Sequence, residues 1–176
     1  MAGMTWTAPE IERVDPPTLG DERAILEGFL DWHRHTLLWK CSGLTAEQLK
    51  TAAAPPSNLT LLGLVRHMTE VERIWFTVRP HGRTPNPIYC TPKNPDADFA
   101  DVADADPAAD IARFQAECQA SRESVAHLPL EHTFVHPRTK QEISLRWVYV
   151  HMIEEYARHN GHADLLRERI DGATGE

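Results

Sequence analysis

The chain has 176 residues, of which 41% are hydrophobic and 25% charged, and its formal net charge is −8. This length suits one domain that is stable without disulfides, and the acidic balance argues against nucleic acid as a partner because phosphate binding rests on lysine and arginine. No apolar run approaches the roughly 18 residues of a membrane span, and the first residues lack the basic start and apolar stretch of a secretory signal, so we expect a cytoplasmic protein without membrane contact.

The start of the chain predicts an extended arm followed by a helix. Residues 1–20 are rich in proline and show no hydrophobic periodicity, which indicates an arm that lies across the body of a single domain formed by residues 21–172. Asp21 is placed to cap a helix that runs to about Lys40. Its apolar stripe recurs at three- and four-residue intervals and consists of Ile25, Leu26, Phe29, Leu30, His33 and Leu37.

A second long helix is expected from about Thr60 to Val78. It follows a short segment in which Thr45 and Gln48 have the spacing of a capping box. The stripe that the second helix turns toward the core contains Leu61, Leu64, His67, Met68, Val71, Ile74, Trp75 and Val78.

The second half of the chain predicts a long loop and two more helices. Residues 80–107 hold six prolines and scattered acidic residues, which indicates a loop with little regular structure. A third helix is expected from about Pro107 to His127, a turn or small hairpin around Pro137 to Gln141, and a fourth helix from about Ser144 to Ile170. Four long helices without an internal repeat predict an all-α protein, a four-helix bundle.

The fourth helix carries the chemistry, because Glu155 and His159 lie at the edge of its apolar arc rather than opposite it. They are one turn apart, so one metal ion can reach both side chains. His67 lies in the middle of the stripe on the second helix and is placed to supply a third ligand. Periodicity alone leaves a second interpretation open, in which a buried Glu–His pair only fixes helix packing.

Other residues are weaker candidates. His151 and His162 share the broad face of the fourth helix and could replace a ligand or support one, and His33 lies in an apolar stripe. Trp75, Trp147 and Tyr156 could line a pocket or be plain core, and Arg146 and Arg158 could hold an anion or pair with glutamates. The acidic stretch from Asp96 to Asp106 is expected to be solvated. Without a C-x-x-C pair, we expect reduced thiols at Cys41, Cys90 and Cys118.

Two stretches, LLGLVRHMTEVERIWF and SLRWVYVHMIEEYARHNGHADLLRERIDG, resemble the mini-circle or mycothiol-transferase branch of the DinB-like superfamily. In that superfamily the ligands are a histidine on the second helix and two histidines four apart on the last. Here Glu155 takes the first of the last two places, and in this respect the chain is similar to the mycothiol-dependent maleylpyruvate isomerases, which use a His, Glu, His set. By position, the resemblance implies ligands at His67, Glu155 and His159.

The resemblance further implies zinc or a comparable divalent ion, frequent homodimers, and transfer of a low-molecular-weight thiol such as mycothiol to an electrophile, as in detoxification. Three protein ligands leave a coordination position open for the thiol, and the ion would deprotonate it. We expect His151 and His162 to support the ligands or handle protons, and Arg158 to anchor the thiol, while the protein's own cysteines are not the nucleophile.

Several alternatives stay open at this point. Nickel, manganese or iron would also suit these ligands. The same ion could activate water instead, which would make the protein a hydrolase. The bundle could also be a non-catalytic, stress-related metal-binding protein, or hold no metal at all.

Overall fold

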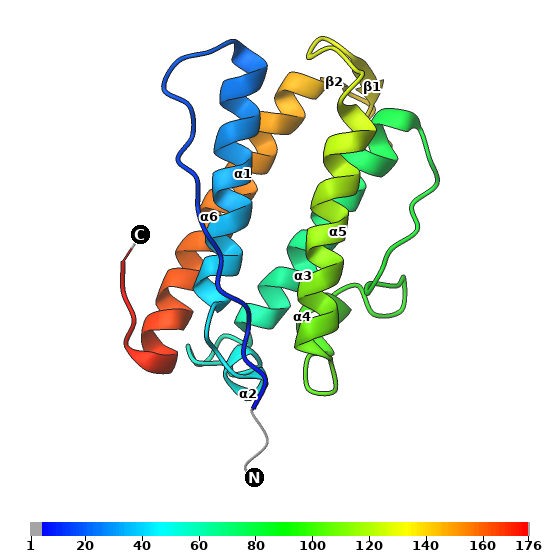
Figure 1. Ribbon diagram of the computed structural model, residues 1–176. Coiled ribbons are helices and arrows are strands. Elements are labelled where there is room, and N and C mark those ends of the chain that lie inside the picture. The colour runs from blue at the N-terminus through cyan, green and yellow to red at the C-terminus, as the bar shows by residue number, and fades with distance from the viewer. Residues whose placement is uncertain (1–4, 176) are drawn as a thin grey trace.

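The computed structural model describes residues 5–175 and shows a four-helix bundle, as the sequence predicts (Figure 1). The long helices are α1 (Glu22–Cys41), α3 (Leu61–Glu72), α5 (Pro107–Val125) and α6 (Leu145–Asp171). Short helices α2 (Ala46–Leu49) and α4 (Ala97–Ala100) lie in the connections. Strands β1 (Thr133–Val135) and β2 (Glu142–Ser144) form the small antiparallel hairpin between α5 and α6.

Side-chain caps fix where the helices begin. Asp21 accepts a hydrogen bond from the backbone N–H of Ala24 at the start of α1, and Thr45 and Gln48 form the predicted capping box of α2. Ser144 caps α6 in the same way, so the fourth helix begins where its sequence indicates. These short-range signals were sufficient to place the helix starts.

The end of the second predicted helix differs from a plain α-helix. After Glu72 the backbone continues as a π-helix, η1 (Arg73–Val78), and then as a 3-10 turn, η2 (Arg79–His81). A π-turn is wider than an α-turn and shifts the side chains that follow it, and such turns often occur at functional sites. A 3.6-residue hydrophobic pattern does not reveal this change.

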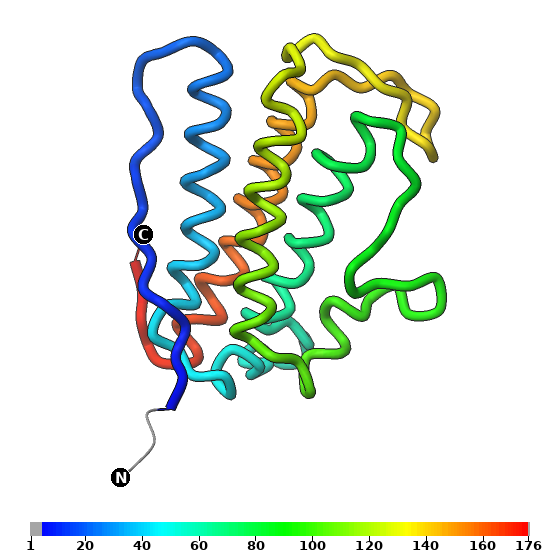
Figure 2. Tube along the Cα trace, turned by 45° about the vertical axis from the view of Figure 1, so that its right-hand side comes forward, coloured from blue at the N-terminus to red at the C-terminus, as the bar shows by residue number. Residues whose placement is uncertain are grey.

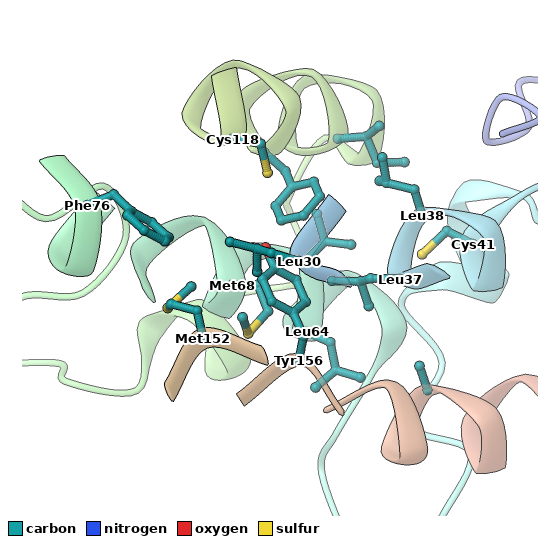
Figure 3. Packing of buried hydrophobic residues seen from close by; sticks show 14 of the residues in the cluster. Leu30, Leu37, Leu38, Cys41, Leu64, Met68, Phe76, Cys118, Met152 and Tyr156 are labelled. Carbon is teal, nitrogen blue, oxygen red and sulfur yellow. The ribbon is translucent and has the colours of Figure 1, made fainter. Parts of the chain in front are cut away.

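The helices enclose one hydrophobic core, in which α1 packs mainly on α6 and α3 on α5 (Figure 2). Figure 3 shows side chains from α1, α3, α5 and α6 meeting in this core, with Tyr156 of α6 among them. One predicted core position is wrong, because Phe29 on α1 is 43% exposed. It lies at the edge of the predicted stripe, next to Leu30, which is fully buried.

A buried ion pair ties three of the helices together at the centre of the core. Arg34 on α1 donates two hydrogen bonds of 2.7 Å to the carboxylate of Glu72 on α3, and Tyr156 on α6 donates a third to the same carboxylate, also at 2.7 Å. Glu72 is completely buried and Arg34 is 3% exposed. Because Tyr156 adjoins Glu155, these bonds fix α6 against α3 next to the candidate ligands.

The N-terminal segment runs along the bundle (Figures 1 and 2). Ala8 is buried and exchanges backbone hydrogen bonds with Leu44 and Gly43. Residues 1–4 of the predicted arm lie outside the described residues, and the division into an arm and a single domain stays a prediction. Within the described part of the chain, no helix combines the length and the apolar character that crossing a membrane requires.

Candidate metal centre

Three side chains meet between α3 and α6: His67 from the first helix, and Glu155 and His159 from the second. Each offers one ligand atom, and these atoms all lie within 4.8 Å of one another. The imidazole rings of His67 and His159 are in edge contact, with centroids 4.8 Å apart. The structure thus brings together the three residues that the sequence singled out, at distances that one metal ion can bridge.

Asp98 orients His67. Its carboxylate lies 2.8 Å from Nδ1 of His67, and the ring of Phe99 stacks on the imidazole with centroids 4.9 Å apart. Because Nδ1 is occupied in this way, Nε2 is the nitrogen that His67 can present to a metal. A carboxylate behind a histidine ligand fixes its tautomer and strengthens it as a donor.

Asp98 is held as an anion although it is 4% exposed. Burial raises the pKa of its carboxyl group, but the hydrogen bond and charge of His67 and a hydrogen bond with Cys90 outweigh that effect, so the pKa is lowered overall. The expectation that the stretch from Asp96 to Asp106 is solvated is therefore wrong at Asp98. The short helix α4 turns this residue inward.

Arg66 on α3 fastens α4 in place. Its guanidinium group donates to the backbone carbonyls of Asp98 and Ala97 at 3.0 and 3.1 Å and forms an ion pair of 3.1 Å with Asp110. It also lies over the ring of Tyr89, whose hydroxyl donates to Asp110. Most of the predicted loop is irregular, but this part of it is anchored and completes the site.

His159 is suited to act as a neutral ligand. Burial lowers its pKa to about 4, and the charges of His67, His162 and Arg158 act in the same direction. Its Nδ1 lies 3.4 Å from Nδ1 of His162 and its Nε2 lies 3.5 Å from the carboxylate of Glu155. Near neutral pH the imidazole is therefore uncharged, and the tautomer that carries its proton on Nδ1, facing His162, would leave the lone pair of Nε2 for a metal.

The other candidates surround these three at different distances. Nε2 of His151 lies 3.7 Å from the carboxylate of Glu155, one turn along α6. Arg158 is exposed beside His159. Arg146 lies away from the site and forms ion pairs with Glu22 and Glu131. Of its two predicted roles, anion binding or pairing with glutamates, the structure shows the second.

His33 and the cysteines do not join the three convergent side chains. His33 contacts the side chain of Asn160 at 3.3 Å. All three cysteines are free thiols. Burial raises the pKa of Cys41 to about 12 and also raises that of Cys118 and of Cys90, so all three stay protonated at neutral pH and are poor nucleophiles.

Comparison with known proteins decides the family. The family model described as mycothiol-S-transferase matches residues 25–172. The chain belongs to the mycothiol S-transferase family. The match covers α1 from Ile25 onward, the other three long helices in full, and all three convergent side chains. The comparison with curated proteins gave no match.

A solved structure shares the fold of this family member. It is YfiT from Bacillus subtilis, described as a probable metal-dependent hydrolase with an unusual four-helix bundle topology. The likeness has a TM-score of 0.64 and 19% sequence identity, and it covers 92% of this chain and 95% of YfiT. At this identity the likeness supports the four-helix bundle and not the activity.

The three convergent residues of this transferase-family chain fit a divalent ion. Two imidazoles and one carboxylate are a donor set used by catalytic zinc sites, which keep a further position open. Asp98 supplies the outer hydrogen bond that a histidine ligand usually has. The partial exposure of the His67 and Glu155 side chains, 25% in each case, leaves access from solvent.

Replacing Asp98 with asparagine is expected to weaken metal binding about 10- to 100-fold, because loss of an outer partner loosens the histidine and lowers its basicity. The measurement is zinc affinity by competition with a chelator. Asp104→Asn is the matched control, because Asp104 is an exposed carboxylate of the same acidic stretch. Equal zinc affinities for the two variants and the wild type would show that Asp98 does not support the site.

Proposed function

We propose that this member of the mycothiol S-transferase family transfers a low-molecular-weight thiol, mycothiol, to a small electrophile at a divalent metal centre formed by His67, Glu155 and His159. The observation that carries the proposal is the convergence of these three donor atoms within 4.8 Å. Family membership supplies the thiol as co-substrate.

Each residue around the proposed metal centre has its own role. A divalent ion bound by the three ligands would lower the pKa of a thiol placed at its open position. Asp98 holds the ring of His67, and His162 contacts the ring of His159 on the side away from Glu155. Arg158 offers an exposed positive charge beside the site for the thiol co-substrate, and His151, whose Nε2 lies 3.7 Å from the carboxylate of Glu155, is the residue proposed to handle protons.

The reaction is a nucleophilic substitution or addition at carbon. The thiol gives up its proton, a sulfur–carbon bond forms, and one bond of that carbon breaks, either the bond to its leaving group or, in an alkene, the π bond to the neighbouring carbon. With an alkyl halide the halide leaves; with an epoxide the carbon–oxygen bond opens and the oxygen takes a proton; with an activated alkene the neighbouring carbon takes it. All three acceptors give a thioether and need no oxidant.

Zinc is the proposed ion, because two histidines and a carboxylate with an open position are a common zinc arrangement; nickel, manganese and iron are alternatives that availability can favour. A homodimer is proposed from the family resemblance, and size-exclusion chromatography with light scattering tests it. A mass of one chain, 19.9 kDa, would contradict the dimer.

Hydrolysis is the second candidate function. An ion with three protein ligands can activate water as well as a thiol. YfiT, which shares the fold, is described as a probable metal-dependent hydrolase. A non-catalytic metal-binding bundle is the remaining alternative.

Product analysis separates these functions. The zinc-loaded protein is incubated with an alkyl halide, an epoxide or an activated alkene, with mycothiol, with glutathione or without thiol, and the products are identified by mass spectrometry. The proposal expects a thioether and an equal loss of mycothiol. Turnover to an alcohol without thiol would indicate a hydrolase, and no turnover of any acceptor by zinc-loaded protein would indicate a non-catalytic bundle.

A further inference from the structure

A cavity of about 890 Å³ lies beside the metal centre, between η1, the β1–β2 hairpin and the first turns of α6. In Figure 1 the hairpin stands at the end of the bundle where α6 begins. Residues from all three elements line the cavity: Trp75 from η1, Arg138 and Ile143 from the hairpin region, and Trp147 and His151 from α6. None of the steps proposed above uses the two tryptophans or Arg138.

Aromatic rings form one wall of the cavity. The ring centroid of Trp75 lies 5.5 Å from that of Trp147 and 4.5 Å from that of His151, and Trp147 stacks on His151 at 4.8 Å. Trp147 is 46% exposed, which is unusual for so large an apolar side chain. The π-turn of η1 presents Trp75 at this place. Such a wall favours a flat, unsaturated ligand.

Positive charge gathers beside these rings without an acidic partner. The guanidinium group of Arg79 lies 3.8 Å over the ring of Trp75, and its Nη1 is buried with no hydrogen-bond partner in the described part of the chain. Arg138 lines the cavity, and residues 5–175 contain no ion pair for either arginine. Burial and the charge of Arg138 both lower the pKa of Arg79, so the two groups repel each other.

Other charged groups at the cavity do not cancel this charge. Burial and the charges of Arg79, Arg138 and Lys140 lower the pKa of His136, which also lines the cavity. Glu142 is the one carboxylate in the lining, and the hydroxyl of Thr133 donates to it at 2.6 Å. It forms no ion pair with Arg79 or Arg138. An anionic group bound at Arg138 would offset the repulsion.

The cavity reaches the metal centre through His151. This residue lines the cavity, and its Nε2 lies 3.7 Å from the carboxylate of Glu155. Four residues along an α-helix correspond to roughly 6 Å. A ligand in the cavity can therefore bring a reactive carbon close to the open side of the three ligands.

We propose that this cavity binds the acceptor and that the acceptor is a flat, unsaturated organic anion, with its unsaturated part against Trp75 and Trp147 and its carboxylate or similar group at Arg138. Arg79, behind Trp75, adds to the positive field. The inference rests on the proposed function for the reaction that the ligand undergoes. A neutral polyol, such as the sugar part of a thiol, would leave Arg138 unpaired.

Binding of a matched pair of probes tests the cavity without any turnover. Cinnamate is a flat unsaturated anion, and cinnamyl alcohol is its neutral counterpart. Their affinities are measured by calorimetry and by quenching of tryptophan fluorescence, in zinc-loaded and in metal-free protein. We expect cinnamate to bind about 10-fold or more tightly than the alcohol in both forms, because a charge-assisted hydrogen bond contributes more than a neutral one.

Variants locate the binding. Arg138→Gln is expected to remove most of the preference for the anion, and Trp147→Ala to weaken both probes; both positions are at the surface of the cavity, so the fold is preserved. Arg113→Gln, an exposed arginine on α5, is the control and is expected to bind as the wild type does. Four results would each overturn the inference. Two concern the preference for the anion: that acid and alcohol bind equally, or that Arg138→Gln leaves the preference unchanged. The others are that inositol binds more tightly than cinnamate, or that the preference is seen only with zinc present.

The two proposals can fail separately. If the protein binds the anion at Arg138 but the product analysis shows hydrolysis, the cavity assignment holds and the thiol transfer is rejected. Thioether formation together with no preference for the anion would leave the transferase standing and reject the acceptor class.

Discussion

Alanine at Glu72 is expected to lower the free energy of unfolding by about 3–5 kcal/mol, because it removes the buried carboxylate from the Arg34 guanidinium and leaves only the ion pair with the partly exposed Asp31. Glu72 is completely buried and accepts hydrogen bonds from both Arg34 and Tyr156. For a domain of this size the loss corresponds to a fall in Tm of roughly 6–20 °C. Thermal unfolding followed by circular dichroism measures it, with Glu168→Ala, an exposed glutamate on α6, as the control.

A double variant tests the same network if the single variant does not fold. Arg34→Met with Glu72→Leu removes both charges, and replacing a buried ion pair by apolar residues of similar volume is often neutral. We expect it to recover most of the lost stability, with a residual loss from the unpaired hydroxyl of Tyr156 and from the lost ion pair between Arg34 and Asp31. A double variant as unstable as Glu72→Ala, or a Glu72→Ala protein that unfolds like the wild type, would contradict this account of the core.

Alanine at His67 or at Glu155 is expected to remove bound metal, with a loss of affinity beyond the 10- to 100-fold that follows from losing an outer partner. Each change leaves only two of the three convergent donors. Metal content after dialysis against zinc is measured by elemental analysis. His127→Ala is the matched control, because His127 is exposed and far along the chain from the three candidate ligands.

The outcome also separates the metal centre from a purely structural Glu–His pair. If Glu155 served only to fix His159, its loss would lower stability and leave zinc content unchanged, because there would be no zinc to lose. If the wild type does hold zinc, the same zinc content in either variant would mean that the ion is bound elsewhere.

The helices and the convergence of the three candidate ligands were predictable because they depend on short-range patterns. Apolar spacing placed four long helices, and capping residues such as Asp21 and Ser144 placed their starts. Glu155 and His159 are one turn apart on one helix, so their proximity follows from helical geometry alone. His67 was found because a histidine in an apolar stripe faces the core.

The surroundings of the site were not predictable in this way. Asp98 comes from an irregular segment with no periodicity, and only the tertiary contacts of Arg66 turn it toward His67. The cavity joins a π-turn to a hairpin 60 residues or so further along the chain, and neither feature has a periodic signal. Nothing in the local sequence marks Arg34 and Glu72 as a buried pair, because they are 38 residues apart along the chain.

The most direct test of the central claim is thiol conjugation by metal-free protein as zinc is added back in steps. The account predicts that thioether formation rises in proportion to zinc and saturates at about one zinc per chain, with no product in the absence of thiol. Conjugation that is the same with and without bound metal, or a product formed without thiol, would contradict it.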